Sequence, residues 1–279
     1  MVRGNEIFGR RGLLNQMSDL TQDIKRILED QVAIAGNFLP LPNDPGSHTP
    51  EISHTPNLGS QASDLGEPGE PDERWSRFLS LIPPDSPLHQ MTTLEQITEY
   101  VANTVLVPID ETRINPVPGV GNPNADLMVI GEAPGADEDK KGEPFVGRAG
   151  RLLDKILAAV NFTRNDIFIA NILKSRPPRN RDPKPDEIEA HLPILLRQIT
   201  IVRPKLILCV GRVAGNVITG QNSTLKALRQ RNFHDFHGVP LMVTYHPAAL
   251  LRSEQYKRPT WEDVKALRAR YDELVNANV

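Results

Sequence analysis

Three polar side chains that could take part in catalysis each follow a short apolar segment of the chain. They are a carboxylate, an amide and an imidazole, carried by Glu132, Asn171 and His246. A carboxylate can activate water or favour a neighbouring cation, an amide can read a pattern of hydrogen bonds, and an imidazole can donate to developing negative charge. Taken singly, each has a structural explanation as a helix-capping acid, a turn residue or a strand-end histidine. Together, at equivalent positions, they favour one catalytic site, provided that the segments before them lie side by side.

The segments before these residues are predicted to be strands of one sheet. Apolar runs at 127–130, 167–170, 206–210 and 241–244 are too short for helices and are bounded by turn residues or charges. Helical patterns precede, separate and follow them at 92–104, 149–160, 185–202, 212–219, 224–230 and 260–276. Because strands that alternate with helices imply right-handed crossovers, the sheet should be parallel. We therefore predict an α/β fold, a three-layer α/β/α sandwich with a four-stranded parallel sheet, which binds ligands beyond the carboxyl ends of its strands.

Composition divides the 279 residues into three parts. Residues 1–38 carry apolar residues at helical spacing over 12–35, and this amphipathic helix could dock on its own domain, pair with a copy of itself or bind a protein partner. Residues 39–74 are rich in Pro, Gly and Ser and are predicted to be a disordered linker. Residues 75–279 carry all the predicted strands and are expected to form the catalytic domain.

Composition also excludes several classes of protein. No apolar run approaches the roughly eighteen residues of a membrane span, and no apolar stretch of a secretory signal follows Arg10 and Arg11, so we expect a cytoplasmic location. The one cysteine, Cys209, excludes an intramolecular disulfide and any all-cysteine metal site. The net charge is −3, but the acidic excess lies in the first 91 residues. The densest basic cluster, which suits either a solvated loop or phosphate contacts, comprises Lys174, Arg176, Arg179, Arg181 and Lys184.

Three longer motifs surround the candidate catalytic residues. The first is Gly-Glu-Ala-Pro-Gly at 131–135, followed by Gly-Glu-Pro-Phe-Val-Gly-Arg-Ala-Gly at 142–150. The second joins Asn171 to Lys-Ser-Arg-Pro-Pro at 174–178 and Asn-Arg-Asp-Pro at 180–183, and the third runs from His246 to Arg252. Over about residues 100–270 the chain resembles the family 4 uracil-DNA glycosylases. The resemblance implies their fold and a monofunctional enzyme that flips uracil out of DNA and hydrolyses its bond to the sugar, as in base excision repair.

The resemblance implies a role for each motif residue. Glu132 and His246 are the expected catalytic residues: Glu132 would orient the attacking water and stabilise the cationic sugar, and His246 would donate to uracil O2. Phe145 would stack on the uracil ring, and Asn171 would read O4 and N3–H, a pattern that cytosine lacks. The other expected uracil-binding residues form the glycine-rich turn: Gly131, Ala133, Pro134 and Gly135. The expected DNA contacts are Arg148, Lys174, Arg176, Pro247, Leu250, Leu251 and Arg252. Either leucine could fill the space that the flipped base leaves, or simply pack a short helix.

The sequence departs from the family at one cofactor. Typical family 4 enzymes hold a [4Fe–4S] cluster on four cysteines, and those positions carry Thr104, Val107, Ser175 and His191 here. Since thiolates are the ligands of such clusters, we expect no cofactor. Hydrogen bonding or apolar packing should hold these segments together instead.

Two other functions remain open. A weak or inactive relative could bind uracil or a lesion in DNA without cleaving it, although the intact Glu132, Asn171 and His246 argue against this. A nucleotide-binding or acyl-transfer enzyme is disfavoured because Gly119-Val120-Gly121 precedes the first strand instead of following it, and neither a Walker motif nor a Gly-x-Ser-x-Gly elbow occurs. Uracil-containing DNA is therefore the expected partner.

Overall fold

The computed structural model of the chain describes residues 71–277. The helix expected at 12–35, the partner expected to bind it and most of the expected linker lie outside these residues and remain predictions. The predicted end of the linker, at residue 74, is wrong: Pro71–Ser80 forms helix α2. Its Trp75 and Phe78 are buried in the core, so α2 belongs to the folded domain.

A sheet lies at the centre of the described chain, in the strand order β1-β3-β2-β4-β6-β5. Its four central strands are parallel, as predicted. They are β2 (Leu127–Gly131), β3 (Ile167–Asn171), β4 (Leu206–Val210) and β6 (Val239–Thr244). Their carboxyl ends therefore lie along one edge of the sheet.

Short antiparallel strands at the two edges were not predicted. They are β1 (Val120–Gly121), which pairs with β3, and β5 (His234–Phe236), which pairs with β6. Segments of this length show no strand periodicity. The turn from β5 into β6 consists of His237 and Gly238, both with positive φ, as tight hairpins require.

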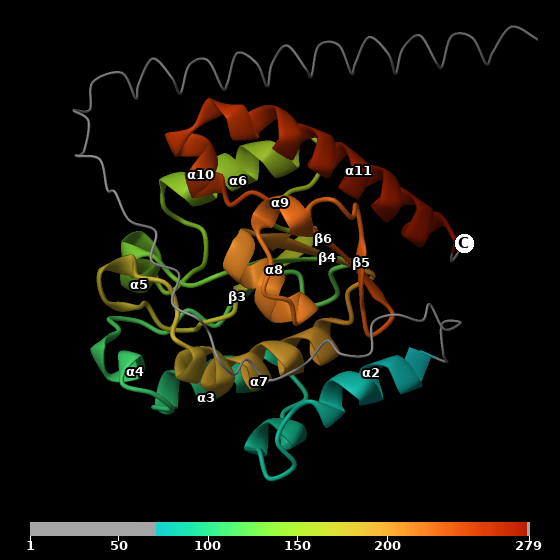
Figure 1. Cartoon of the computed structure of the whole chain (residues 1–279). Helices are drawn as coiled ribbons and strands as arrows, with labels where there is room; N and C mark the ends of the chain where they lie inside the picture. Colours follow the sequence, from blue (N-terminus) through green and yellow to red (C-terminus); the bar gives the residue numbers. More distant parts are fainter. Residues whose placement is uncertain (1–70, 278–279) are drawn as a thin grey trace, which may run out of the picture. The chain divides into compact units, whose positions relative to one another are not determined.

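Helices cover both faces of the sheet (Figure 1). One face carries α2, α3 (Leu94–Asn103), α7 (Pro185–Val202), α8 (Arg212–Thr219) and α9 (Leu225–Leu228). The other carries α6 (Arg148–Ala158) and α11 (Lys257–Asn276), and α10 (Pro247–Arg252) packs on α6. Shorter elements complete the chain: η1 (Pro87–Gln90), α4 (Ile109–Thr112), α5 (Ala136–Lys141), η2 (Pro178–Asn180) and η3 (Glu254–Tyr256).

Each central strand supplies side chains to two cores. In β4, Ile207 and Cys209 face the α7 side, whereas Leu206, Leu208 and Val210 face the α6 side. This alternation follows from the two-residue period of a strand, and burial on both faces explains why the strands are apolar throughout. The predicted three-layer α/β/α sandwich is therefore confirmed.

Local signals set the ends of the longer helices. Pro185 occupies the first turn of α7, and the Glu187 carboxylate accepts the Lys184 amide at 2.8 Å, so α7 begins as predicted. Thr93 caps α3 in a capping box with Gln96. In residues 71–277 we find no helix whose length and hydrophobicity would let it cross a bilayer.

Candidate active site

The predicted catalytic residues meet at the carboxyl edge of the sheet. Gly131, the last residue of β2, is paired with Asn171, the last residue of β3. Gly211, which follows β4, donates its amide to the last carbonyl of β6 at 2.8 Å, two residues before His246. Glu132 directly follows Gly131. The parallel register thus brings together the carboxylate, the amide and the imidazole from segments far apart in sequence.

A small residue at position 131 lets two side chains approach. A Cβ atom on Gly131 would lie 2.6 Å from Cζ of Phe145 and would collide with Oδ1 of Asn171. The rings of Phe145 and His246 are 5.6 Å apart, centre to centre, and inclined at 33°. Phe145, Asn171 and His246 therefore form one cluster around Gly131.

The Phe145 ring is held by a backbone conformation that its neighbours impose. Phe145 has φ of +54°, a conformation that costs a residue with a side chain about 1–3 kcal/mol. The Arg164 guanidinium donates to the carbonyls of Pro144, at 3.2 Å, and of Phe145. Gly150 in α6 has no side chain, and a Cβ there would overlap the Phe145 carbonyl. Arg164 and Gly150 thus fix the direction of the ring.

Glu138 connects the glycine-rich turn to the Phe145 loop. One carboxylate oxygen accepts the amide of Gly135 at 3.1 Å, and the other accepts the amides of Val146 and Gly147, each at 2.9 Å. Sequence reasoning missed Glu138. A glutamate three residues after a turn residue often reaches back to a free amide at a helix start, and this signal could have found it.

The amide oxygen of Asn171 is buried without a partner. The residue is 2% exposed, and its Oδ1 is the one buried side-chain N or O atom of the described chain that makes no hydrogen bond. An unpaired buried acceptor costs about 1–3 kcal/mol. A ligand that brings a hydrogen-bond donor to this oxygen would offset that cost.

The hydrogen bond at one ring nitrogen fixes the tautomer of His246. Its Nδ1 accepts the amide of Ala248 at 3.1 Å, so the ring proton resides on Nε2 and can be donated. Burial, and then the positive charge of Arg252, lower the pKa of His246 to about 4. His246 is therefore a neutral donor at pH 7.

Glu132 is poised between its two protonation states. Burial, and then the negative charge of Asp182, raise the pKa of Glu132 to about 7, while the charge of Arg212 opposes them. Asp182 and Arg212 form an exposed ion pair at 3.5 Å. Sequence reasoning assigned these two no role, although Arg212 directly follows a strand end. A carboxyl with this pKa can act as a base at neutral pH.

Comparison with known proteins decides the family. The family described as the Uracil DNA glycosylase superfamily matches residues 118–265. The Type-4 uracil-DNA glycosylase of Archaeoglobus fulgidus is 39% identical over 184 residues, which cover 63% of this chain and 92% of the relative. That of Sulfurisphaera tokodaii is 40% identical over 186 residues, which cover 64% and 84%. The chain belongs to the type-4 uracil-DNA glycosylases. The resemblance seen in the three motifs, and the enzyme class that it implied, are confirmed.

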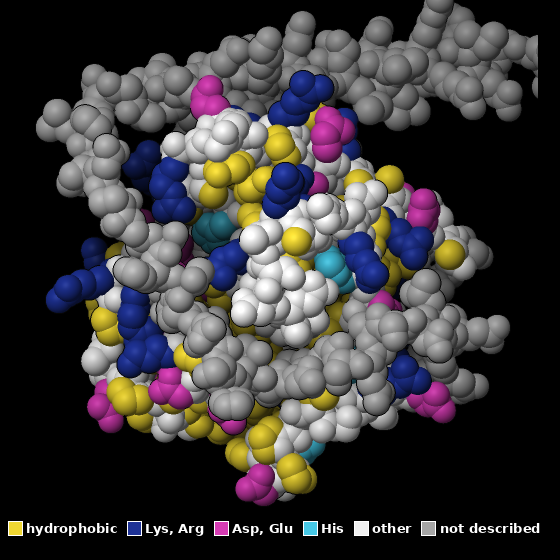
Figure 2. Space-filling view, in the orientation of Figure 1, with side chains coloured by type: hydrophobic (Ala, Val, Ile, Leu, Met, Phe, Trp, Pro, Cys, Tyr) yellow, Lys and Arg dark blue, Asp and Glu magenta, His cyan; other side chains and the backbone are white. Residues whose placement is uncertain are grey.

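Four of the predicted DNA contacts of this glycosylase reach the surface. Arg148 at the start of α6 and Arg252 at the end of α10 are exposed, and Leu251 is partly exposed. Arg176 is partly exposed, and its Nε donates to Asn180 at 2.7 Å. Figure 2 shows Lys and Arg side chains around a recessed histidine on the face near α10 and α8. Contact of these four residues with DNA stays a prediction.

Three other predicted DNA contacts have side chains that are buried in the free protein, so the structure gives no support for contact of these side chains with DNA. Lys174 is fully buried, and its Nζ donates to the Asn171 carbonyl at 2.8 Å and to Gln198 Oε1 at 2.7 Å. Burial lowers the pKa of Lys174 to about 7. Pro247 and Leu250 are buried at the inner side of α10. A wedge from this helix would therefore have to be Leu251.

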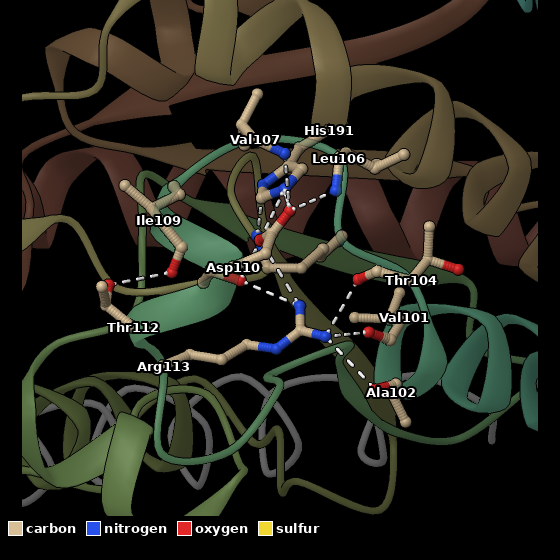
Figure 3. A network of polar contacts seen from close by, with 12 residues as sticks. Val101, Ala102, Thr104, Leu106, Val107, Ile109, Asp110, Thr112, Arg113 and His191 are labelled. Atoms are coloured by element: carbon tan, nitrogen blue, oxygen red, sulfur yellow. Dashed lines mark hydrogen bonds and ion pairs between the residues drawn. The ribbon is translucent and has the colours of Figure 1, made fainter.

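Two of the positions expected for cluster cysteines, 175 and 191, converge on the carboxylate of Asp110, and Figure 3 shows His191 beside it. Ser175 donates its hydroxyl to this carboxylate, and His191 Nε2 lies 3.1 Å from its Oδ1. The amides of Leu106 and Val107, the latter a third cysteine position, donate to Oδ2 at 2.9 and 3.1 Å. Burial alone would raise the pKa of Asp110, but the hydrogen bonds from His191 and Ser175 hold it well below its ordinary value.

The fourth position, Thr104, joins the same network through Arg113. The Nη2 of Arg113 donates to the carbonyls of Val101, Ala102 and Thr104, at 2.6, 3.3 and 3.1 Å, where α3 ends (Figure 3). Its Nη1 donates to the Ser175 hydroxyl at 3.1 Å. The guanidinium thus satisfies the open carbonyls of a helix end and ties that end to the second motif. Of the two alternatives expected for these segments, hydrogen bonding or apolar packing, hydrogen bonding is the one found here.

The donor set at these positions does not fit an iron–sulfur cluster. Val107 has no ligating group, Thr104 contributes a carbonyl, and the side chains of Ser175 and His191 are bound to Asp110. The one thiol, that of Cys209, is buried in β4, and burial raises its pKa. A thiolate cluster has no ligands here.

We expect the purified protein to contain no stoichiometric iron or acid-labile sulfide and to be colourless. The reason is that oxygen and nitrogen donors already paired in a network replace all four thiolates. Iron and sulfide assays beside a visible spectrum measure this. A visible absorption band accompanied by stoichiometric iron would contradict the expectation.

Proposed function

We propose that this chain is a monofunctional uracil-DNA glycosylase, which hydrolyses the N-glycosidic bond of a flipped-out uracil in DNA and leaves an abasic site for base excision repair. The observation that carries the proposal is the unpaired, buried Oδ1 of Asn171 beside Phe145. A uracil stacked on Phe145 would bring N3–H to this oxygen, whereas N3 of cytosine carries no proton. The relatives named as uracil-DNA glycosylases support the same substrate.

His246 and Glu132 act at opposite sides of the breaking bond. As the bond lengthens, its electron pair moves to uracil and O2 becomes negative, while the sugar becomes cationic. The neutral Nε2–H of His246 donates to O2, and one preorganised donor of this kind is worth about 3–4 kcal/mol. Glu132, as a carboxylate, favours the cationic sugar and orients a water molecule. The water adds to C1′ and its proton passes to Glu132.

The burial of Lys174 supports a monofunctional reaction. A glycosylase that also cuts the strand uses an amine to attack C1′. Lys174 is the lysine nearest to Asn171 in sequence, but its amino group is buried and bound to the Asn171 carbonyl and to Gln198. Lys174 is therefore not a candidate amine nucleophile, and we propose water in that role.

A uracil-containing oligonucleotide tests the proposal. Incubation with the protein should release free uracil, and the strand should break at the uracil position only after heating in alkali. Matched oligonucleotides with cytosine or thymine at that position should stay intact. Binding of the uracil strand without release of base would identify an inactive relative, and breakage without alkali would identify a lyase.

Asn171→Asp should lower the rate of uracil excision by about tenfold to a hundredfold, because the donor to O4 is lost. A protonated carboxyl at this position could pair with cytosine, so slow excision of cytosine is also expected. Single-turnover rates on the two oligonucleotides measure both effects. Asn165→Asp, the same change at an exposed residue, is the matched control. Equal rates in Asn171→Asp and Asn165→Asp would remove Asn171 from the site.

A further inference from the structure

The amino group of Lys174 is a buried polar group that the chemistry above leaves without a role. It lies in the second motif, three residues after Asn171, and is fully buried. No carboxylate of residues 71–277 forms an ion pair with it, and both of its hydrogen-bond acceptors are uncharged. A buried lysine that lacks a counter-charge is costly, so its two hydrogen bonds must offset much of that cost.

The acceptors of this amino group connect Asn171 to the opposite layer. One acceptor is the carbonyl of Asn171, at 2.8 Å, and the other is Oε1 of Gln198 in α7, at 2.7 Å. Gln198 in turn donates to the carbonyl of Pro118 at 2.8 Å. Lys174 and Gln198 therefore tie the end of β3 to α7 and to the segment that leads into β1.

Both backbone polar groups of Lys174 are also hydrogen-bonded. Its amide donates to Nδ1 of His191 at 3.0 Å, and its carbonyl accepts the amide of Val117 at 2.9 Å. His191 also contacts Asp110, so Lys174 is anchored in the network that stands at the type-4 cysteine positions. All three polar groups of the residue are thereby used.

The segment after Asn171 is fixed on its other side by the catalytic turn. The amides of Ile172 and Leu173 donate to the carbonyls of Gly131 and Glu132, each at 3.0 Å. The Asn171 carbonyl faces away from that turn, and Lys174 supplies its hydrogen bond. Without the amino group this carbonyl would be a buried acceptor without a partner, in the residue whose side chain reads the base.

We propose that Lys174 is a positioning residue for uracil recognition: its buried amino group holds the Asn171 backbone so that the Asn171 amide meets the pyrimidine edge. This inference rests on the proposed function. It places Lys174 in the network that replaces the cluster and removes it from the DNA surface. The ligand that depends on Lys174 is a free or flipped uracil ring.

Lys174→Met tests the proposal because methionine keeps an apolar stem and removes the amino group. We expect the inhibition constant of free uracil to rise by about tenfold, the equivalent of one lost buried hydrogen bond. The side-chain amide resonances of Asn171 should also shift in a nitrogen–proton NMR spectrum. Arg197→Met is the matched control: Arg197 is a buried α7 cation that donates to the Met91 carbonyl at 2.6 Å and does not contact the second motif. Arg197→Met should lose a comparable amount of thermal stability. It should leave the inhibition constant of uracil and the Asn171 resonances unchanged.

A second variant covers the case in which Lys174→Met does not fold. Gln198→Met removes the other acceptor of the amino group and should move the same Asn171 resonances by a smaller amount. Unmoved resonances in the variants that fold, or equal effects in Arg197→Met, would overturn the role of Lys174. A wild-type protein that leaves uracil in DNA would overturn the proposed function instead, and the NMR comparison would still decide on Lys174.

Discussion

Replacement of His246 by alanine is expected to slow the release of uracil by about two to three orders of magnitude in single-turnover experiments. In the proposed reaction the Nε2–H of His246 donates to O2 of the leaving base, and the Ala248 amide on Nδ1 fixes the ring tautomer. Because burial and Arg252 lower the pKa of His246 to about 4, the ring is neutral at neutral and alkaline pH. The loss of rate should therefore be the same over that whole range.

A control must separate the loss of the His246 donor from the loss of its role as a helix cap. His246 caps α10, and loss of a helix cap costs about 1 kcal/mol of stability. His246→Asn keeps an acceptor for the Ala248 amide but cannot reach the base, so it should be nearly as stable as the wild type and almost as slow as His246→Ala. Affinity for DNA that holds an uncleavable uracil should change little in both variants, since the donor acts mainly in the transition state. A folded His246→Asn protein with the wild-type rate would place the donor elsewhere.

Glu132→Gln is expected to slow cleavage by about a hundredfold or more, because the amide cannot accept the proton of water or favour a cationic sugar. The pH dependence should change with it. Burial and Asp182 raise the pKa of Glu132 to about 7, and in the proposed reaction the active form is the carboxylate. The wild-type kcat/KM should therefore fall as pH drops below about 7 and level off above it. In Glu132→Gln the acid limb of the profile should disappear.

Changes at the neighbouring ion pair should move this limb in opposite directions. Asp182→Asn removes a negative charge that raises the pKa of Glu132, so the enzyme should stay active to lower pH. Arg212→Gln removes the opposing positive charge and should shift the limb to higher pH. The dependence of kcat/KM on pH, measured for both variants, gives this comparison. Each variant serves as the control for the other because both residues are exposed. An acid limb that persists in Glu132→Gln would show that another group, such as Lys174, titrates there.

The parallel core of the fold and the position of the site followed from the sequence, since both depend on local patterns. Short apolar runs separated by helices define the parallel strands, and their carboxyl ends place Glu132, Asn171 and His246 on one edge. The edge strands β1 and β5 were not predicted because they are too short to show a strand pattern. They are strands only because they pair with β3 and β6.

The direction of single side chains could not be predicted in the same way. Lys174 lies in a basic run that suggests solvent, yet it is buried because Gln198, 24 residues further on, supplies an acceptor. Asp110 is buried as a carboxylate because His191, 81 residues away, contacts it. Such partners come together only when α7 packs on the sheet. The sequence did show that the cluster thiols were missing, but not which groups replaced them.

A crystal structure of the protein with DNA that carries an uncleavable uracil nucleotide tests the central claim most directly. We expect the flipped uracil to stack on Phe145, with its N3–H about 2.9 Å from Oδ1 of Asn171 and its O2 at a similar distance from Nε2 of His246. The acceptor that is unpaired in the free protein would then be satisfied by the substrate. A uracil bound elsewhere, or one that leaves Oδ1 of Asn171 unpaired, would contradict the account.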